Sequence, residues 1–333
     1  MRRLILLLIV GLGLVPVTCM HSPGALEAGD GRQILSVVAL PHGELDLGEV
    51  RAVGAWELDS PNHHFGSYSA LVSLGDGSVL AATDTGRRLR FAPPGNAGPA
   101  ARFDYFALLT TGEKRLFDIE AMTRDAGTGQ VWAAYENTNL IERYSAALRS
   151  EARARPTAMR GWSSNAGPEA MVRLADGRFV VLSEASRRWF AGDVPAVLFA
   201  GDPVEGAAEL AFRYRPPAGY RPVDMAALPD GRVLILVRKV VWSIPPGFAG
   251  KIVVADPAAI RPGETWSGRV IAELADPLPS DNYEGLAIEP AAGGDVVLWL
   301  ISDDNSIRLQ RTLLLKLLWT PNEKARGSNR APG

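Results

Sequence analysis

Carboxylic acids recur at two positions of a repeated sequence pattern, and they are the residues of this chain most able to do chemistry. Each copy of the pattern holds two short apolar runs, with polar residues before the first run and after the second. The position before the first run holds Ser69, Glu120, Glu169, Asp224 and Glu284. The position after the second run holds Asp84, Glu136, Glu184, Arg238 and Asp303. The pattern predicts a cluster of acids wherever the repeats gather around one point.

Such a cluster indicates a cation, because buried carboxylates that repel one another cannot all stay ionised in a dry site. Oxygen ligands favour a hard divalent ion, and Ca²⁺ tolerates an irregular arrangement of them. The proposed ligands are Glu120, Glu169, Asp224 and Glu284, with neutral oxygens available from Asn137, Asn165, Asn282 and Asn305. The same acids also have a purely structural interpretation, in which they accept backbone N–H bonds or link neighbouring repeats.

A metal site of this kind would suit hydrolysis of an ester or phosphoester. Glu136 or Asp303 would be the general base that activates water. Arg87 and Arg311 would steady an anionic substrate, since guanidinium groups bind carboxylate and phosphate well. His64 lies in a loop of the same region and would contact the ligand.

The elements that must position these residues are β-hairpins. In each repeat the two apolar runs are joined by Asp-Gly, Thr-Gly or Gly-Gly, as in E-A-M-V-R-L-A-D-G-R-F-V-V-L-S-E at 169–184. Such turns are a strong hairpin signal because glycine accepts the positive φ that they require. The turn glycines are Gly77, Gly129, Gly177, Gly231 and Gly294.

A hairpin that recurs about every 50 residues is the signature of a β-propeller with four strands per blade. We therefore predict an all-β fold, a propeller of five or six blades of four-stranded antiparallel sheets. Outer strands are expected at 195–200, 210–214, 251–255 and 269–274. Strands are also expected at 34–40 and 50–58, and one of them should complete the last blade beside 312–319 and close the ring. In a propeller the two polar positions would surround the mouth of the central channel.

Composition excludes several classes of function. The 333 residues carry a net charge of −2, which argues against binding nucleic acid through bulk charge. The single cysteine excludes a disulfide framework and zinc sites built on cysteine. The four histidines form none of the common metal-binding motifs.

The N-terminus has the features of an export signal. Two arginines precede 14 apolar residues at 4–17, a run too short for a good membrane span. Cys19 follows this run, as in a bacterial lipoprotein signal whose cysteine is acylated; cleaved soluble export and an uncleaved anchor are the alternatives. We predict a signal peptide at 1–19, a flexible tether at 20–32, the propeller at 33–319 and a disordered tail at 320–333. The protein would be exported, to the periplasm or as a lipoprotein of the outer membrane that faces the periplasm.

Several motifs resemble one known family. The stretch D-N-Y-E-G-L-A-I at 281–288, with L-W-L-I-S-D-D-N at 298–305 and Q-R-T-L-L-L-K at 310–316, is similar to the C-terminal signature of the phytase-like family, described as "esterase-like activity of phytase". D-I-E-A-M with Y-E-N, and G-P-E-A-M with its Asp-Gly turn, are similar as well. The resemblance covers residues 33–319 and implies an exported bacterial β-propeller with an ester-directed hydrolytic activity. F-G-S-Y-S-A and T-D-T-G-R depart from the family's pattern at the rim, which leaves the substrate open.

Three functions fit these observations. The first is a metal-assisted hydrolase that acts on a small anionic or ester substrate at the channel mouth. The second is a non-catalytic propeller of the cell envelope that binds a ligand or a protein. The third is a lactone hydrolase that uses a single Ca²⁺. For all three we expect a monomer that binds no nucleic acid and meets a membrane only through an N-terminal lipid.

Overall fold

The computed structural model describes residues 30–41, 43–106, 118–184, 192–242, 247–305 and 310–321. Within these residues the regular structure consists of strands and short 3₁₀ turns, and no helix is long and apolar enough to cross a membrane. The predicted signal peptide with Cys19, most of the tether and nearly all of the tail lie outside the described residues. Asp30 already contacts the fold, because its carbonyl oxygen accepts a hydrogen bond from the His63 amide (3.1 Å).

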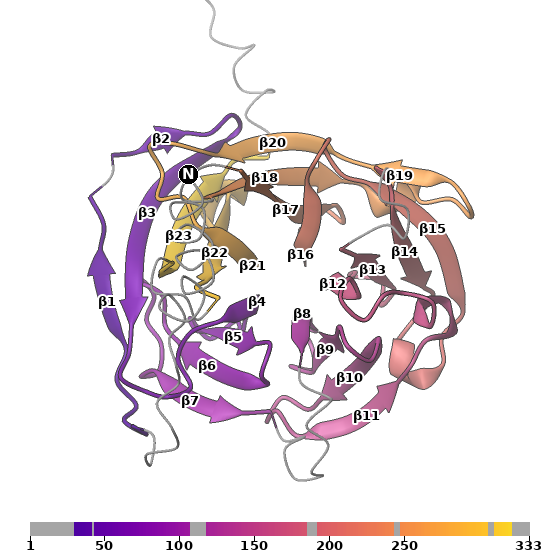
Figure 1. Cartoon of the computed structure of the whole chain (residues 1–333), viewed down its shortest axis with the longest axis horizontal. Coiled ribbons are helices and arrows are strands. Elements are labelled where there is room, and N and C mark those ends of the chain that lie inside the picture. The colour runs from indigo at the N-terminus through magenta and orange to yellow at the C-terminus, as the bar shows by residue number, and fades with distance from the viewer. Residues whose placement is uncertain are drawn as a thin grey trace, which may run out of the picture.

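Five sheets stand around a central axis like the blades of a propeller (Figure 1). The first blade holds β4 (Tyr68–Ser73), β5 (Val79–Thr83), β6 (Arg87–Phe91) and β7 (Arg102–Tyr105). The second holds β8 (Ile119–Arg124), β9 (Val131–Tyr135), β10 (Leu140–Tyr144) and β11 (Ser150–Ala154). The third holds β12 (Pro168–Arg173), β13 (Phe179–Ser183), β14 (Val194–Phe199), β15 (Glu209–Arg215) and β19 (Thr265–Ser267). The fourth holds β16 (Arg221–Ala227), β17 (Val233–Val241), β18 (Gly247–Ala255) and β20 (Arg269–Leu274).

The fifth blade closes the ring by combining the two ends of the described chain. Its sheet runs β1 (Ser36–Ala39), β3 (Val50–Asp59), β23 (Thr312–Trp319), β22 (Val296–Asp303) and β21 (Asn282–Pro290), and β2 (Leu45–Asp46) pairs with β3. Antiparallel pairing of β3 with β23 joins Leu58 to Thr312. The predicted propeller and the predicted closure are therefore confirmed, and the number of blades is five. The remaining elements are 3₁₀ turns, namely η3 (Thr157–Met159), η4 (Pro203–Glu205), η5 (Pro257–Ala259) and η6 (Ala292–Gly294).

The hairpin turns form as the sequence predicts. All five turn glycines have positive φ, between 76° and 89°. These turns lie at one end of the strands, so the starts of the inner strands and the ends of the second strands lie together at the other end. Strands β4, β8, β12, β16 and β21 surround the axis (Figure 1). We call the end of the central axis where these inner strands begin the mouth.

The core lies in layers between neighbouring blades. The second strands of the first three blades are buried throughout, as in β13, where all five residues are buried. Trp132 of β9 packs edge-on against Phe179 of β13, with ring centroids 5.1 Å apart. This packing of one blade on the next holds the inner strands in place and thereby fixes the residues at the mouth.

Candidate functional site

A β-bulge at the start of each inner strand directs one residue away from the regular pairing. The register skips Ser69, Glu120, Glu169, Val223 and Glu284 in the five blades. A bulge leaves the extra residue outside the ladder and re-aims its side chain. Three glutamates thus share one structural position near the mouth. Ser69 uses the same position differently, because its hydroxyl donates to the carbonyl oxygen of Ile119 in the next blade (2.6 Å).

The fourth blade corrects the alignment made from the sequence. Asp224 pairs with Leu236, and the equivalent pair in the third blade is Ala170 with Leu182. Asp224 therefore stands one residue after the bulge, where the other blades have alanine or glycine, and Val223 is the true equivalent of the glutamates. The sequence alignment matched the acids by type, although Asp224 lies one residue closer to its turn glycine than Glu169 does.

Asp224 is fully buried, and backbone amides take up its carboxylate. Oδ1 accepts from the Met225 amide (2.8 Å) and Oδ2 accepts from the Leu286 amide (2.6 Å). The Leu71 amide of the first blade also donates to it. Burial raises the pKa of Asp224 well above its usual value in spite of these three bonds. The residue ties three inner strands together, which is the structural role considered above, and we leave it out of the candidate site.

Three carboxylates of the second blade lie closest together. One ligand oxygen from each of Asp118, Glu120 and Glu136 lies within 4.8 Å of the others. Asp118 also forms side-chain hydrogen bonds with Glu120 and Glu136, which favour its charged form. We call these three residues the acidic triad. Asp118 was not proposed as a site residue from the sequence because it precedes the repeat, although it opens the D-I-E-A-M motif and lies two residues before Glu120.

Glycine at position 167 lets the triad pack tightly against the third blade. The Gly167 amide donates to Oε1 of Glu136 (3.3 Å). A Cβ atom at this glycine would lie 2.8 Å from the carbonyl oxygen of Glu136 and 2.9 Å from its Cγ. Real side chains do not approach so closely, so the absence of a side chain here sets the position of Glu136.

The remaining acids extend the cluster around the mouth. Glu169 is buried and donates its carboxyl proton to Glu136. Glu284 is also buried and accepts from the amide nitrogen of Asn282 (2.8 Å). Asp303 accepts from the Asn305 amide (2.7 Å), and its electrostatic neighbours include Glu284 and Asp84. The structure thus brings together the predicted residues Glu120, Glu136, Glu169, Glu284 and Asp303, with Asp118, Asp84 and Glu184 beside them.

Burial and mutual repulsion raise the pKa values of these acids. The pKa of Glu136 rises to about 7, chiefly because burial penalises its charged form. The pKa values of Glu120, Glu169 and Asp303 lie well above their usual range for the same reason, with the neighbouring acids adding to the effect. Burial also raises the pKa of Asp84, although solvent reaches its side chain, as expected for a group that lines a channel. Burial and repulsion therefore favour the protonated forms of these groups in the metal-free protein.

Arg238 is a basic residue in direct contact with this cluster. Its Nη2 lies 2.8 Å from Oε1 of Glu284 and 3.9 Å from Oε1 of Glu184, so it bridges the third and fifth blades from the fourth. The charges of Glu169 and Asp303 also act on it.

The predicted substrate-binding residues lie farther out. The Arg311 guanidinium pairs with Glu57 of β3 (3.2 Å). Arg87 donates to the His63 carbonyl oxygen (2.8 Å) and to Thr85 (2.7 Å), although its charge still reaches Asp84. His64 is buried against Tyr105 of the outermost strand β7, with ring centroids 4.1 Å apart, and burial lowers its pKa to about 4. These contacts hold the three side chains to the outer strands and their loops.

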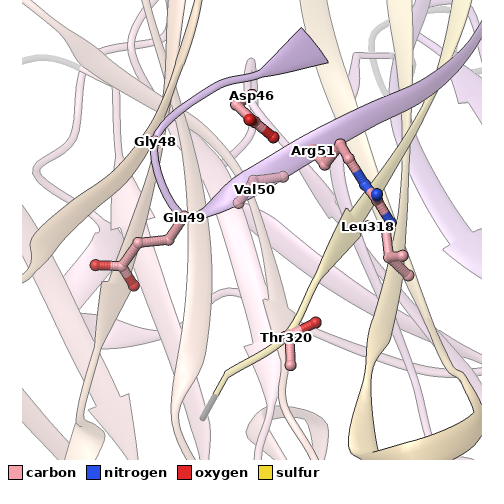
Figure 2. A pocket seen from close by; sticks show the side chains of 7 residues that line it. All are labelled: Asp46, Gly48, Glu49, Val50, Arg51, Leu318 and Thr320. Carbon is pink, nitrogen blue, oxygen red and sulfur yellow. The ribbon is translucent and has the colours of Figure 1, made fainter. Parts of the chain in front are cut away.

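A pocket of about 150 Å³ lies at the opposite end of the fifth blade from the mouth (Figure 2). Its walls come from the β2–β3 turn and the end of β23, and they include Asp46, Glu49 and Arg51. Arg51 pairs with Glu44 (3.2 Å) and Glu49 pairs with Arg269, so the charges of these two lining residues are already matched. This pocket is separate from the acidic cluster.

The family follows from the sequence match that spans this site. Residues 63–306, which include all three triad acids, match the family model described as "Phytase-like: Esterase-like activity of phytase". The chain belongs to the phytase-like family. No curated protein matches this phytase-like chain by sequence.

Solved structures match the phytase-like propeller as a fold alone. The glutaminyl cyclase of Myxococcus xanthus is 12% identical with a TM-score of 0.43, and the match covers 85% of this chain and 97% of that one. A nidogen/laminin complex gives 10% identity and a TM-score of 0.43, with 84% and 96% covered. The WD40 repeats of RRP9 give 9% identity and a TM-score of 0.42, with 83% and 100% covered. At these values the matches carry no argument about function.

Proposed function

We propose that this phytase-like protein is an exported, metal-assisted hydrolase of ester or phosphoester substrates, with its site at the channel mouth. The observation that supports it most is the acidic triad, whose ligand oxygens lie within 4.8 Å of one another. Oxygens at this separation can all reach one Ca²⁺, whose bonds to oxygen are about 2.3–2.6 Å long. Asp118, Glu120 and Glu136 would hold the ion, and its charge would offset the repulsion between their carboxylates.

A bound divalent cation would supply Lewis acidity, polarising the carbonyl or phosphoryl oxygen of the substrate and making water easier to deprotonate. Glu136 was a predicted general base, but it belongs to the triad, so we assign the proton transfer to Glu169. Glu169 is buried and hydrogen-bonded to Glu136. As a protonated carboxyl group it would give its proton to the leaving oxygen and then accept the proton released by the attacking water, so that ester and water give acid and alcohol. Asp303 interacts with Glu284 and Asp84 instead, and we assign it no step.

Thermal unfolding with Ca²⁺, with Mg²⁺ and with EDTA tests the metal site. The chain from residue 30 onward contains every strand of the five sheets and is suitable for this measurement. An ion at 100 times its dissociation constant stabilises the folded state by about 2.7 kcal/mol. For a domain of this size that is a rise of about 5 °C in the midpoint.

Glu120→Gln should abolish this rise because it removes one of the three charges that hold the ion. The same substitution should raise the midpoint of the metal-free protein, since Glu120 is penalised there by burial and by its acidic neighbours. Glu57→Gln is the control, because Glu57 lies on β3 and pairs with Arg311. No shift of the wild-type midpoint at millimolar Ca²⁺ or Mg²⁺ would refute the metal site.

Turnover is then measured on carboxylic esters, phosphoesters and lactones. Metal-dependent hydrolysis that Glu169→Gln removes without unfolding the protein would support the enzyme. Metal binding without turnover on any of the three classes would instead favour a non-catalytic binding propeller.

A further inference from the structure

We infer that Arg238 binds an oxygen of the substrate, holding an oxyanion or a polarised carbonyl oxygen across the channel mouth from the acidic triad. This inference rests on the proposed function, because it names the residue that would orient the substrate beside the metal. The sequence had suggested Arg87 and Arg311 for this task, and the structure places both beside other partners.

The strand register places Arg238 at a position that holds an acid in each of the other blades. Val237 pairs with Pro222 in the fourth blade, as Ser183 pairs with Pro168 in the third. The next residue along is Arg238 in the fourth blade and Asp84, Glu136, Glu184 and Asp303 in the others. The bulge position of the same blade holds Val223 in place of a serine or glutamate. The fourth blade therefore interrupts the acidic ring at both positions and presents a guanidinium there.

The Arg238 guanidinium has a donor without a hydrogen-bond partner among the described residues. Nη2 contacts Glu284, while the Nε–H is buried and has no hydrogen-bond partner among the described residues. A buried donor without a partner costs about 1–3 kcal/mol, so an acceptor that fills this place is favoured. The side chain is one-fifth exposed, which leaves it accessible from the channel.

The orientation of Arg238 is set before any ligand arrives. Its partner Glu284 is buried and is held by the side-chain amide of Asn282 (2.8 Å). The guanidinium carbon also lies 5.9 Å from the centre of the Phe248 ring, within range of a cation–π contact. A preorganised donor next to a developing negative charge is the arrangement that stabilises acyl and phosphoryl transfer.

Arg238 and the triad belong to one connected set of side chains. The charge of Glu169 acts on Arg238, and the carboxyl of Glu169 is hydrogen-bonded to Glu136. A substrate oxygen on Arg238 would therefore lie next to the group to which we assign the proton transfer. An acyl oxygen and a phosphoryl oxygen share this chemistry, and two probes separate them.

The experiment measures binding of acetate and of methylphosphonate by titrated thermal midpoints, at constant ionic strength, in Ca²⁺ and in EDTA. We expect at least one anion to bind the wild type, Arg238→Gln to weaken it at least tenfold, and Arg238→Lys to weaken it less. Arg143→Gln is the matched control, since Arg143 is similarly buried and pairs with Asp202 (2.7 Å) away from the mouth. The anion that binds more tightly indicates whether an acyl or a phosphoryl oxygen is preferred.

Arg238→Gln leaves Glu284 without its partner, so the paired variant Arg238→Gln with Glu284→Gln keeps the test valid if the single variant is unstable. Equal anion binding by the wild type and either Gln variant, or no binding by the wild type, overturns the inference. The Ca²⁺ shift is read in the same samples. Its absence, together with the absence of a Mg²⁺ shift, refutes the metal site, whereas its presence together with unchanged anion binding in the variants refutes only the role of Arg238.

Discussion

Replacing Asp224 tests whether this acid has a structural role or binds the metal. Asp224→Ala removes the acceptor for the amides of Leu286 and Met225, at 2.6 and 2.8 Å, and for the amide of Leu71. Each buried donor that loses its partner costs about 1–3 kcal/mol, and removing a poorly solvated carboxylate offsets part of the total. We expect a loss of about 3–5 kcal/mol in the free energy of unfolding.

At about 2 °C per kcal/mol for a domain of this size, the melting midpoint should fall by about 6–10 °C. Asp224→Asn should lie between the wild type and the alanine variant, because its amide keeps one accepting oxygen but turns a donor toward the other amides. Circular dichroism melts with and without Ca²⁺ measure both effects. The Ca²⁺-induced shift should be the same size in all three proteins. A metal-free midpoint within 2 °C of the wild type, with the Ca²⁺ shift lost, would refute this reasoning and make Asp224 a ligand.

Two further predictions concern the triad. The metal-free protein should lose stability as the pH rises from about 4.5 through about 7, because Glu136 and its neighbours bind protons more tightly folded than unfolded. Saturating Ca²⁺ should remove this loss of stability, since the bound form needs ionised carboxylates. A metal-free midpoint that rises between pH 5 and 8 would contradict the raised pKa values of these acids. Gly167→Ala should weaken Ca²⁺ binding at least tenfold by displacing Glu136, as titrated midpoints will show. Gly192→Ala, where a Cβ meets no atom within 4 Å, is the control, and equal Ca²⁺ binding by both variants would mean that Glu136 does not need its present position.

The sequence predicts the propeller well because its signals are local. A turn glycine between two apolar runs determines a hairpin within about 15 residues, and all five such glycines adopt the expected φ. Closure by residues 50–58 was also predictable, because the last repeat lacked a fourth strand after 312–319. The sequence left the number of blades at five or six. The pairing of β3 with β23 closes the ring at five.

The candidate site was predictable in composition but not in detail. Glu120, Glu169 and Glu284 could be found because they precede similar apolar runs. Asp224 was misaligned because the acids were matched by type, whereas the fourth blade has a valine at the bulge and its aspartate one residue later. Contacts between distant segments were equally invisible, and the pairing of Arg311 with Glu57 is the clearest example.

Closure of the ring also determines the order in which the molecule can be completed. Glu57 and Arg311 meet although they lie 254 residues apart, so β3 stays without its β23 neighbour until almost the whole chain is available. Contacts between such distant segments form slowly, and an unpaired strand edge is prone to join another chain meanwhile. The first and second blades are built from consecutive segments and can form earlier. Loss of residues 50–59 would therefore leave the edge of β23 unpaired. Only a chain that contains both β3 and β23 can complete the fifth blade.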